Sequence, residues 1–310
     1  MSLIEETLKK HGYIYQQSIG KGGFGSCFLI TSTKYNQEFA CKVINPTDSS
    51  NCENVSSFHR EVSALIALDH PSIIHIYDVF EDNNMMFIVL EYCSGGNLKD
   101  KIDLLHGIKG QLLFDYILQI VDALKFVHSK GYAHNDIKPS NVFITSYGKL
   151  KLADFGLTEH NVLDTCRFCG SFDYMAPEVI KRIPHDPIKS DIWSLGVTIY
   201  QIASGELPFG ATNGMELLHE IKMGYEKIKW LPPALSYIIK MCLQTDPNKR
   251  PTIDDIDDFL HKAVITERKS QEYPFPTKRM SNPSLNSKKR LIIIPKVLSC
   301  GDGKTNPFYI

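Results

Sequence analysis

The sequence lacks the features that would place the chain in a membrane. It contains no run of about 18 apolar residues, which is the shortest stretch that reads as a membrane-spanning helix. Residues 1–10 lack the basic start and apolar stretch of a signal peptide, and Ser2 stands where N-myristoylation requires glycine. We therefore expect no membrane span and a cytoplasmic or nuclear location.

An excess of charge and a disulfide pattern are also absent. The formal net charge is -1 in 310 residues, which gives no reason to expect binding to nucleic acid. The 8 cysteines are scattered through a chain without a signal peptide, so we expect reduced thiols. Cys166 and Cys169 have the spacing of half a zinc site, but no second pair or histidine doublet completes it.

The pattern of apolar residues changes character near residue 92. Before that point, β-branched and aromatic residues alternate as in strands, in YIYQQSIG, SCFLITST, EFACKVI and MMFIVLEY. A single helix is expected among these strands, in SSFHREVSALIALDH. Its apolar face is predicted to carry Phe58, Val62, Leu65 and Ile66.

Helical patterns dominate after Gly95 and Gly96, in LLFDYILQIVDALKFVHSKG, KSDIWSLGVTIYQIASG and ALSYIIKMCLQTD. We predict an α+β fold with a small β-rich lobe followed by a larger helical lobe. From about residue 264 the composition shifts to Pro, Ser, Asn, Lys and Arg, which predicts a disordered basic tail. Its cluster at residues 288–290 is either a solvated charge run or a site for nuclear import or for a regulatory partner.

A glycine-rich segment, IGKGGFGSC, places Gly20, Gly22 and Gly25 at the spacing of a phosphate-binding loop. Such a loop lets backbone N–H groups approach phosphate oxygens without interference from side chains. A dinucleotide-binding fold would require a helix directly after the glycines, whereas SCFLIT continues as a strand. We therefore expect a hairpin here, and an ordinary glycine-rich turn is the alternative for this segment alone.

Lys42 in FACK lies between apolar neighbours on a predicted strand, where a lysine requires an anionic partner. Glu61 on the helix that follows is the expected partner. Such a pair would position the α- and β-phosphates of a nucleotide. Exposed, unpaired side chains are the alternative for either residue taken alone.

His134, Asp136, Lys138 and Asn141 fit the pattern H-x-D-x-K-x-x-N, and the motifs DFG and APE follow it in order. With these motifs the sequence resembles the eukaryotic protein kinases, which implies their bilobal fold. The resemblance implies a domain at 13–263 with lobes at 13–92 and 93–263, an N-terminal extension at 1–12 and the tail at 264–310.

The resemblance also implies ATP and magnesium as cofactors. Asp136 would orient the substrate hydroxyl or accept its proton, and Lys138 would neutralise the γ-phosphate. Asn141 and Asp154 would hold magnesium through oxygen ligands, and Glu61 would fix Lys42. Leu90 resembles the gatekeeper of the adenine pocket. The implied nucleotide-binding residues are Ile19, Gly20, Lys21, Gly22, Gly23, Phe24, Gly25, Cys27, Ala40, Lys42, Leu90, Glu91, Cys93 and Phe143.

The resemblance further implies a class of acceptor. Lys138 and the small Ser171 in GSFDYMAPE resemble the serine/threonine class, so protein substrates with Ser or Thr acceptors are implied. CGSFDYMAPEVI resembles most closely the calcium/calmodulin-dependent kinase group. Positions at which arginine-directed members carry acids are occupied by other residues, which predicts weak selection for basic residues upstream of the acceptor. These positions are Asn97, Ser140 and Gln201.

Structural roles are implied for other residues. Glu178 and Arg250 match an ion pair that braces the activation segment, and Asp191 matches the helix residue that anchors the catalytic loop. A stacked apolar column that assembles in active kinases is matched by Leu65, Ile76, His134 and Phe155.

Asn135 departs from the family pattern. Most members carry arginine there, and it receives a phosphate on an activation-segment threonine, where this chain has Arg167. We expect an activation segment that is ordered without phosphorylation, by Arg167 meeting an acidic side chain, and an enzyme that is active as made or governed by partners. Thr165 is an alternative phosphosite, and tolerated drift is the other explanation of Asn135.

Two rival functions follow from the same residues. A pseudokinase would bind nucleotide and act as a scaffold, but Lys42, Asp136, Asn141 and Asp154 are all present. A dinucleotide-dependent enzyme is disfavoured by the strand that follows the glycines.

Overall fold

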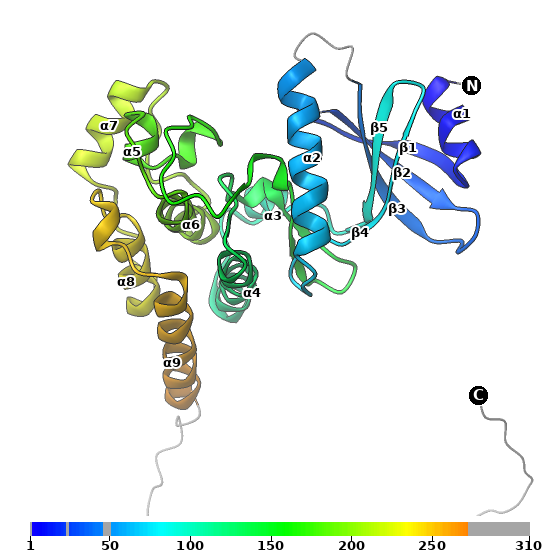
Figure 1. Cartoon of the computed structure of the whole chain (residues 1–310). Coiled ribbons are helices and arrows are strands. Elements are labelled where there is room, and N and C mark those ends of the chain that lie inside the picture. The colour runs from blue at the N-terminus through cyan, green and yellow to red at the C-terminus, as the bar shows by residue number, and fades with distance from the viewer. Residues whose placement is uncertain (1, 23–24, 46–50, 272–310) are drawn as a thin grey trace, which may run out of the picture.

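The computed structural model describes residues 2–22, 25–45 and 51–271, and it has two lobes (Figure 1). The predicted α+β fold is confirmed: a sheet with one long helix forms the first lobe, and helices dominate the second. Gly23 and Phe24 of the glycine loop lie outside the described residues, as does the basic cluster at 288–290.

The small lobe is an antiparallel sheet with the strand order β1-β2-β3-β5-β4. Strand β4 was not among the predicted segments. It lies at the edge of the sheet, and its residues are exposed or only partly buried. Its sequence therefore lacks a clear alternation of apolar and polar residues. The strands are β1 (Tyr13–Gly22), β2 (Gly25–Ser32), β3 (Glu38–Ile44), β4 (Ile76–Asp82) and β5 (Met85–Glu91).

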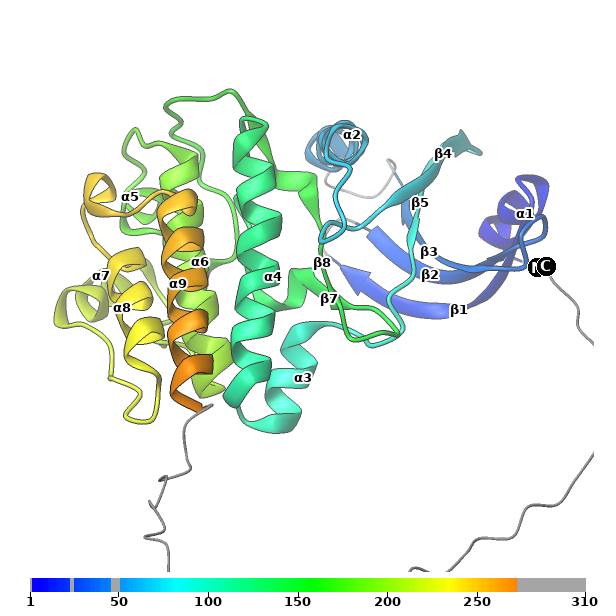
Figure 2. The same cartoon turned by 90° about the horizontal axis from the view of Figure 1, so that it is seen from below.

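The predicted extension at 1–12 forms a helix, α1 (Leu3–Lys10), that packs against the sheet. Ser2 caps its first turn, Leu8 is fully buried, and the Lys10 ammonium lies 2.6 Å from the carboxylate of Asp82. Leu8 joins a core made by alternate residues of β3 and β5, among them Cys41. Helices α1 and α2 lie on opposite faces of the sheet (Figures 1 and 2).

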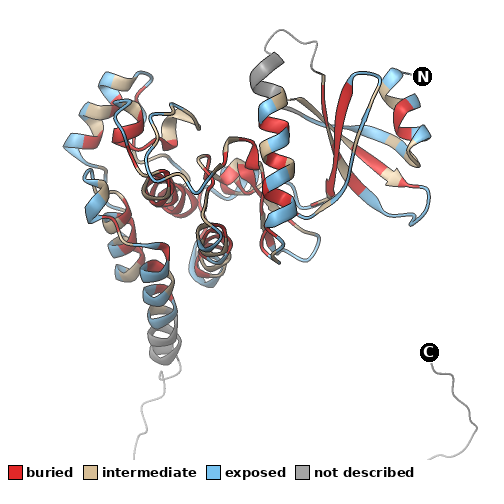
Figure 3. Ribbon diagram, in the orientation of Figure 1, coloured by how far each residue is buried: buried red, intermediate tan, exposed pale blue. Residues whose placement is uncertain are grey.

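Helix α2 (Asn51–Ala67) turns its apolar face toward the other side of the sheet. Phe58 and Leu65 are buried in the core, whereas Ile66 is 68% exposed, so the predicted stripe was wrong at that position. At 100° per residue, Ile66 lies furthest from the axis of a stripe centred on the other members. The burial pattern of α2 is visible in Figure 3.

The large lobe is organised around α6 (Pro187–Ser204), which is buried along nearly its whole length (Figure 3). A helix that is covered on all sides sits at the centre of a domain. It ends at Gly205, in the left-handed conformation with φ of 86°, where the sequence predicts its end. The other helices are α3 (Leu98–Leu105), α4 (Gly110–Ser129), α5 (Pro177–Ile180), α7 (Gly214–Met223), α8 (Pro233–Cys242) and α9 (Ile253–Gln271).

Two short ladders hold the loops that face the small lobe. Strand β6 (Tyr132–Ala133) pairs with β9 (Glu159–His160), and β7 (Val142–Ile144) pairs with β8 (Leu150–Leu152). The loop from β6 to β7 carries Asp136, Lys138 and Asn141, and the loop from β8 to β9 carries Asp154. Helix α9 runs beside α4 and continues to Gln271, past the predicted domain end at residue 263 (Figure 2). Within the described residues, every helix is too short or too polar to cross a bilayer.

Candidate active site

An apolar pocket of about 290 Å³ lies where the sheet meets the large lobe. Its walls come from β1, β2, β3, the end of β5 and β7. Burial raises the pKa of the Cys27 thiol to about 11, so that wall is uncharged at neutral pH. Ile74 and Ala153 also line the pocket but were not predicted. The predicted residues that line it are Ile19, Cys27, Ala40, Leu90, Glu91, Cys93 and Phe143.

The glycine loop forms the predicted hairpin above this pocket, with Gly22 paired with Gly25 and Lys21 paired with Ser26. A side chain at Gly25 would bring its Cβ to 2.4 Å from the carbonyl oxygen of Val43. Glycine is therefore required at this position by the close approach of β3.

Lys42 and Glu61 form the predicted ion pair, with Nζ 2.6 Å from Oε2. The Lys42 ammonium also donates to Oδ1 of Asp154 at 3.2 Å. Burial alone would lower the pKa of Lys42, but the two carboxylates outweigh it and hold that pKa above its ordinary value. Lys42 is therefore a fixed cation between helix α2 and the DFG motif.

A second contact between α2 and the DFG motif was not predicted. Ser57 Oγ donates to the carbonyl oxygen of Gly156 at 3.0 Å, and Arg60 Nε donates to the same oxygen at 2.9 Å. Ser57 lies one turn before Glu61, so helical spacing is the signal that would have placed both on one face. A Cβ at Gly156 would meet Ser57 Oγ at 2.3 Å, so a larger residue there would displace this hydroxyl.

Residues 134–141, the catalytic loop, hold Asp136 in a fixed orientation. Its Oδ1 accepts from the backbone N–H of Ser171 at 2.8 Å, and its Oδ2 accepts from Lys138 Nζ at 2.7 Å and from Asn141 Nδ2 at 2.9 Å. Lys138 Nζ also donates to Ser171 Oγ at 2.5 Å. One network thus joins Asp136, Lys138 and Ser171.

The same network sets the protonation of Asp136, which is 6% exposed. Burial alone would raise its pKa. The charge of Lys138 and the hydrogen bonds from Lys138 and Ser171 oppose burial, and together they hold the pKa of Asp136 below its ordinary value. Asp136 is therefore a carboxylate at neutral pH and can accept a hydrogen bond from an incoming hydroxyl.

Asp191 on α6 anchors the catalytic loop. Its carboxylate accepts from the backbone N–H of His134 at 2.7 Å and from that of Asn135 at 2.8 Å. The ring of His134 contacts Phe155 edge-on, with centroids 4.8 Å apart. Asn135 has φ of 66°, a left-handed conformation that asparagine adopts more readily than most residues.

These contacts bring an apolar pocket, a buried carboxylate and a lysine together where the sheet meets the large lobe. Residues 13–262 match the family described as "Protein kinase domain". The chain belongs to the protein kinase family. It is 36% identical over 257 residues to "Maternal embryonic leucine zipper kinase" of Xenopus tropicalis, a match that covers 80% of this chain and 38% of that protein.

Two other kinases of the family show comparable similarity. "CBL-interacting serine/threonine-protein kinase 12" of Arabidopsis thaliana is 33% identical, over 77% of this chain and 50% of that protein. "Serine/threonine-protein kinase Nek1" of Mus musculus is 34% identical, over 83% of this chain and 21% of that protein. The match thus spans half or less of each of these relatives.

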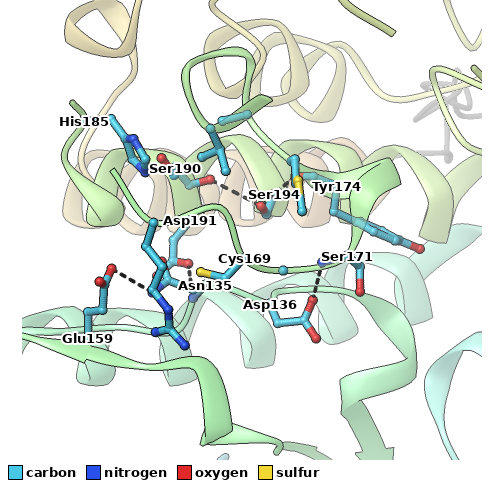
Figure 4. Close-up of a pocket in the computed structure, with 15 residues that line it drawn as sticks. Asn135, Asp136, Glu159, Cys169, Ser171, Tyr174, His185, Ser190, Asp191 and Ser194 are labelled. Carbon is cyan, nitrogen blue, oxygen red and sulfur yellow. Dashed lines mark hydrogen bonds between the residues drawn. The ribbon is translucent and has the colours of Figure 1, made fainter. Parts of the chain in front are cut away.

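Asn135 takes the place of the family arginine and contacts the activation segment, residues 154–178 (Figure 4). Its Nδ2 donates to the carbonyl oxygen of Leu157 at 3.0 Å and to Oε2 of Glu159 at 3.2 Å. The other oxygen of Glu159 accepts from Thr165 Oγ1 at 3.0 Å. A neutral amide and a hydroxyl thus converge on one carboxylate.

Arg167 does not make the contact that we predicted. Its Nη1 donates to the carbonyl oxygen of Leu157 at 3.1 Å rather than to an acidic side chain. The neighbouring carboxylate, Glu159, is already bound on both oxygens by Asn135 and Thr165. Arg167 still ties the activation segment to its own start, but through a backbone acceptor.

The predicted ion pair between Glu178 and Arg250 is present, with oxygen–nitrogen distances of 2.6 and 2.8 Å. Both residues are buried, and Ser190 Oγ also donates to Glu178 at 3.1 Å. A paired charge of this kind holds the end of the activation segment against α6 and the segment before α9.

Two of the three positions at which arginine-directed members carry acids have structural partners here. Gln201 is buried and accepts from Tyr174 Oη at 2.5 Å, while Asn97 caps α3 by accepting from the N–H of Asp100 at 2.9 Å. Ser140 lies in the catalytic loop, within a short 3₁₀ helix. Asp100, an exposed acid at the rim of the nucleotide pocket, was not identified from the sequence.

Proposed function

We propose that this protein transfers the γ-phosphate of ATP to serine and threonine hydroxyls of protein substrates. The observation that carries the proposal is the network around Asp136, in which both carboxylate oxygens are held and Lys138 bridges to Ser171. Phosphoryl transfer depends on positioning and on neutralising charge, and this network supplies both. Two of the relatives carry serine/threonine-protein kinase in their names.

Asn141 and Asp154 fit magnesium as the metal. The Asn141 amide nitrogen donates to Asp136, which leaves its oxygen as the free acceptor. Asp154 uses Oδ1 for Lys42 and keeps a second carboxylate oxygen. Magnesium prefers oxygen ligands and takes the rest of its shell from phosphates and water, so two protein ligands suffice. The bound metal would neutralise charge on the transferring phosphoryl group.

We further propose that the kinase works with an unphosphorylated activation segment. Three contacts support this: the Lys42–Glu61 pair is closed, α2 is joined to Gly156, and Asn135 is joined to Glu159. Each contact is made by unmodified side chains. A segment that is already ordered has no need of an added phosphate to order it.

The test uses bacterially produced, phosphatase-treated protein with labelled ATP, magnesium and a generic protein acceptor. We expect label on serine and threonine, and a rate about 10³-fold lower with Asp136→Asn. Label that appears only after treatment with an upstream kinase would contradict phosphorylation-independent activity. Nucleotide binding without transfer under every condition would favour the pseudokinase scaffold instead.

A further inference from the structure

We propose that Thr165 is an inhibitory modification site, at which a phosphate would release the activation segment from the catalytic loop. The inference rests on the proposed kinase activity and names a way in which that activity is switched off. The inference starts from the negative charge of Glu159, which faces the Thr165 hydroxyl.

The Thr165 hydroxyl is the donor in a charge-assisted hydrogen bond to Oε1 of Glu159, at 3.0 Å. The same carboxylate receives Asn135 from the catalytic loop at 3.2 Å (Figure 4 labels both). Glu159 therefore links three segments of the chain: the catalytic loop, the start of the activation segment and its middle. Loss of either donor, Asn135 or Thr165, would weaken this link.

The backbone fixes Thr165 in this position. Its N–H donates to the carbonyl oxygen of His185 at 2.9 Å, and the N–H of His185 donates back at 3.0 Å. Thr165 is half-buried, and in the observed orientation its hydroxyl points at Glu159. A group added to the hydroxyl would meet the carboxylate directly.

Phosphorylation would reverse the contact. Transfer from ATP joins phosphorus to Thr165 Oγ1, breaks the bond to the β-phosphate oxygen, and releases ADP and the hydroxyl proton. The product carries a charge of about -2 and has no donor for Glu159. The phosphate and the Glu159 carboxylate would then face each other where the Thr165 hydroxyl now donates a hydrogen bond. Two negative charges so close together repel each other.

Arg167 is a cation next to this contact, and His185, which pairs with Thr165 through its backbone, lines the same pocket. The backbone N–H of Arg167 donates to Thr165 Oγ1 at 3.1 Å, while its guanidinium is bound to the carbonyl oxygen of Leu157. If the guanidinium turned to a phosphate on Thr165, it would leave Leu157. After that exchange, the carbonyl oxygen of Leu157 would keep its hydrogen bond from Asn135 but lose the one from Arg167. The start of the activation segment would therefore be held less tightly.

The test installs phosphothreonine at position 165 of the full chain by genetic code expansion and compares kcat/KM with that of the unmodified chain. We expect a loss of about tenfold or more, the cost of losing a hydrogen bond to a charged group. Phosphothreonine at Thr212, which is exposed in the loop before α7, is the matched control and should leave kcat/KM unchanged.

Glu159→Gln gives the decisive second arm. It removes the opposing charge and supplies an amide donor for the phosphate, so modification at Thr165 should cost this variant less than threefold relative to its own unmodified form. Equal or higher activity of the Thr165-modified wild-type chain would overturn the inference, as would an equal loss in Glu159→Gln. An inactive unmodified chain would instead refute the proposed function, so the two failures are distinguishable.

Discussion

Two contacts of the catalytic loop differ in the kind of partner they use. Asp136 faces a cation, Lys138, whereas the adjacent Asn135 is a neutral donor to the carboxylate of Glu159. The first contact favours the charged form of Asp136, the proposed base, and the second holds the activation segment beside the catalytic loop. The proposed chemistry therefore depends on an ion pair, Lys138 with Asp136. The position of the activation segment beside the catalytic loop depends on a hydrogen bond from a neutral side chain, which needs no phosphate.

The charged contact should be the more costly to break. Asp136→Asn keeps the shape of the side chain but removes the base, and we expect kcat to fall by about 10³-fold. ATP affinity should change little, because Asp136 does not line the nucleotide pocket. Steady-state kinetics and a nucleotide-binding titration measure the two quantities. Asp258→Asn, exposed on α9, is the control, and a similar loss there would contradict the assignment.

Lys138→Met tests how the charge of Asp136 is set. Loss of the cation should lower kcat by about 10²-fold or more. Lys138 opposes the effect of burial, so without it burial raises the pKa of Asp136 and the acid limb of the pH profile moves to higher pH. The pH dependence of kcat/KM measures this shift. The exposed Lys149→Met should keep the wild-type profile, and a limb displaced to lower pH would contradict the electrostatic account.

The contrast between the two contacts also explains what the sequence could predict. Lys42 with Glu61 was found because a lysine between apolar neighbours needs an anionic partner, and Glu178 with Arg250 because both residues match an ion pair of the family. The contacts of Ser57 and Arg60 were missed because their acceptor is the carbonyl oxygen of Gly156. Backbone acceptors exist at every position, so they leave no mark in the sequence.

The same reason accounts for the error at Arg167. An arginine in an activation segment suggests a carboxylate partner, yet it binds a backbone oxygen, and Glu159 is bound by Asn135 and Thr165. Only the fold brings β9 beside β6 and so places Glu159 next to the catalytic loop. The pairing of β6 with β9 therefore determines which donors reach Glu159, and the residue type of Arg167 does not reveal it.

Glu61→Gln sharpens the comparison within the small lobe. It removes the negative charge that faces Lys42 from α2, so we expect kcat/KM to fall by about 10²-fold as the proposed phosphate-binding cation shifts. Ser57 and Arg60 still join α2 to Gly156, and the helix should stay in place. Hydrogen exchange of α2 together with kinetics would separate misplacement from unfolding. Glu81→Gln, exposed on β4, is the control, and wild-type activity of Glu61→Gln would contradict the proposed role of the pair.

The neutral contact should give the smallest effect. Asn135→Asp conserves shape and tolerates the left-handed backbone, but it removes the donor to Leu157 and Glu159 and adds a like charge. We expect kcat/KM to fall by about tenfold, with part of the loss restored in Asn135→Asp combined with Glu159→Gln. Asn84→Asp is a matched control, since Asn84 is exposed and also left-handed, with φ of 59°. Unchanged activity in Asn135→Asp would mean that the activation segment is held without this contact, and that Asn135 is tolerated drift.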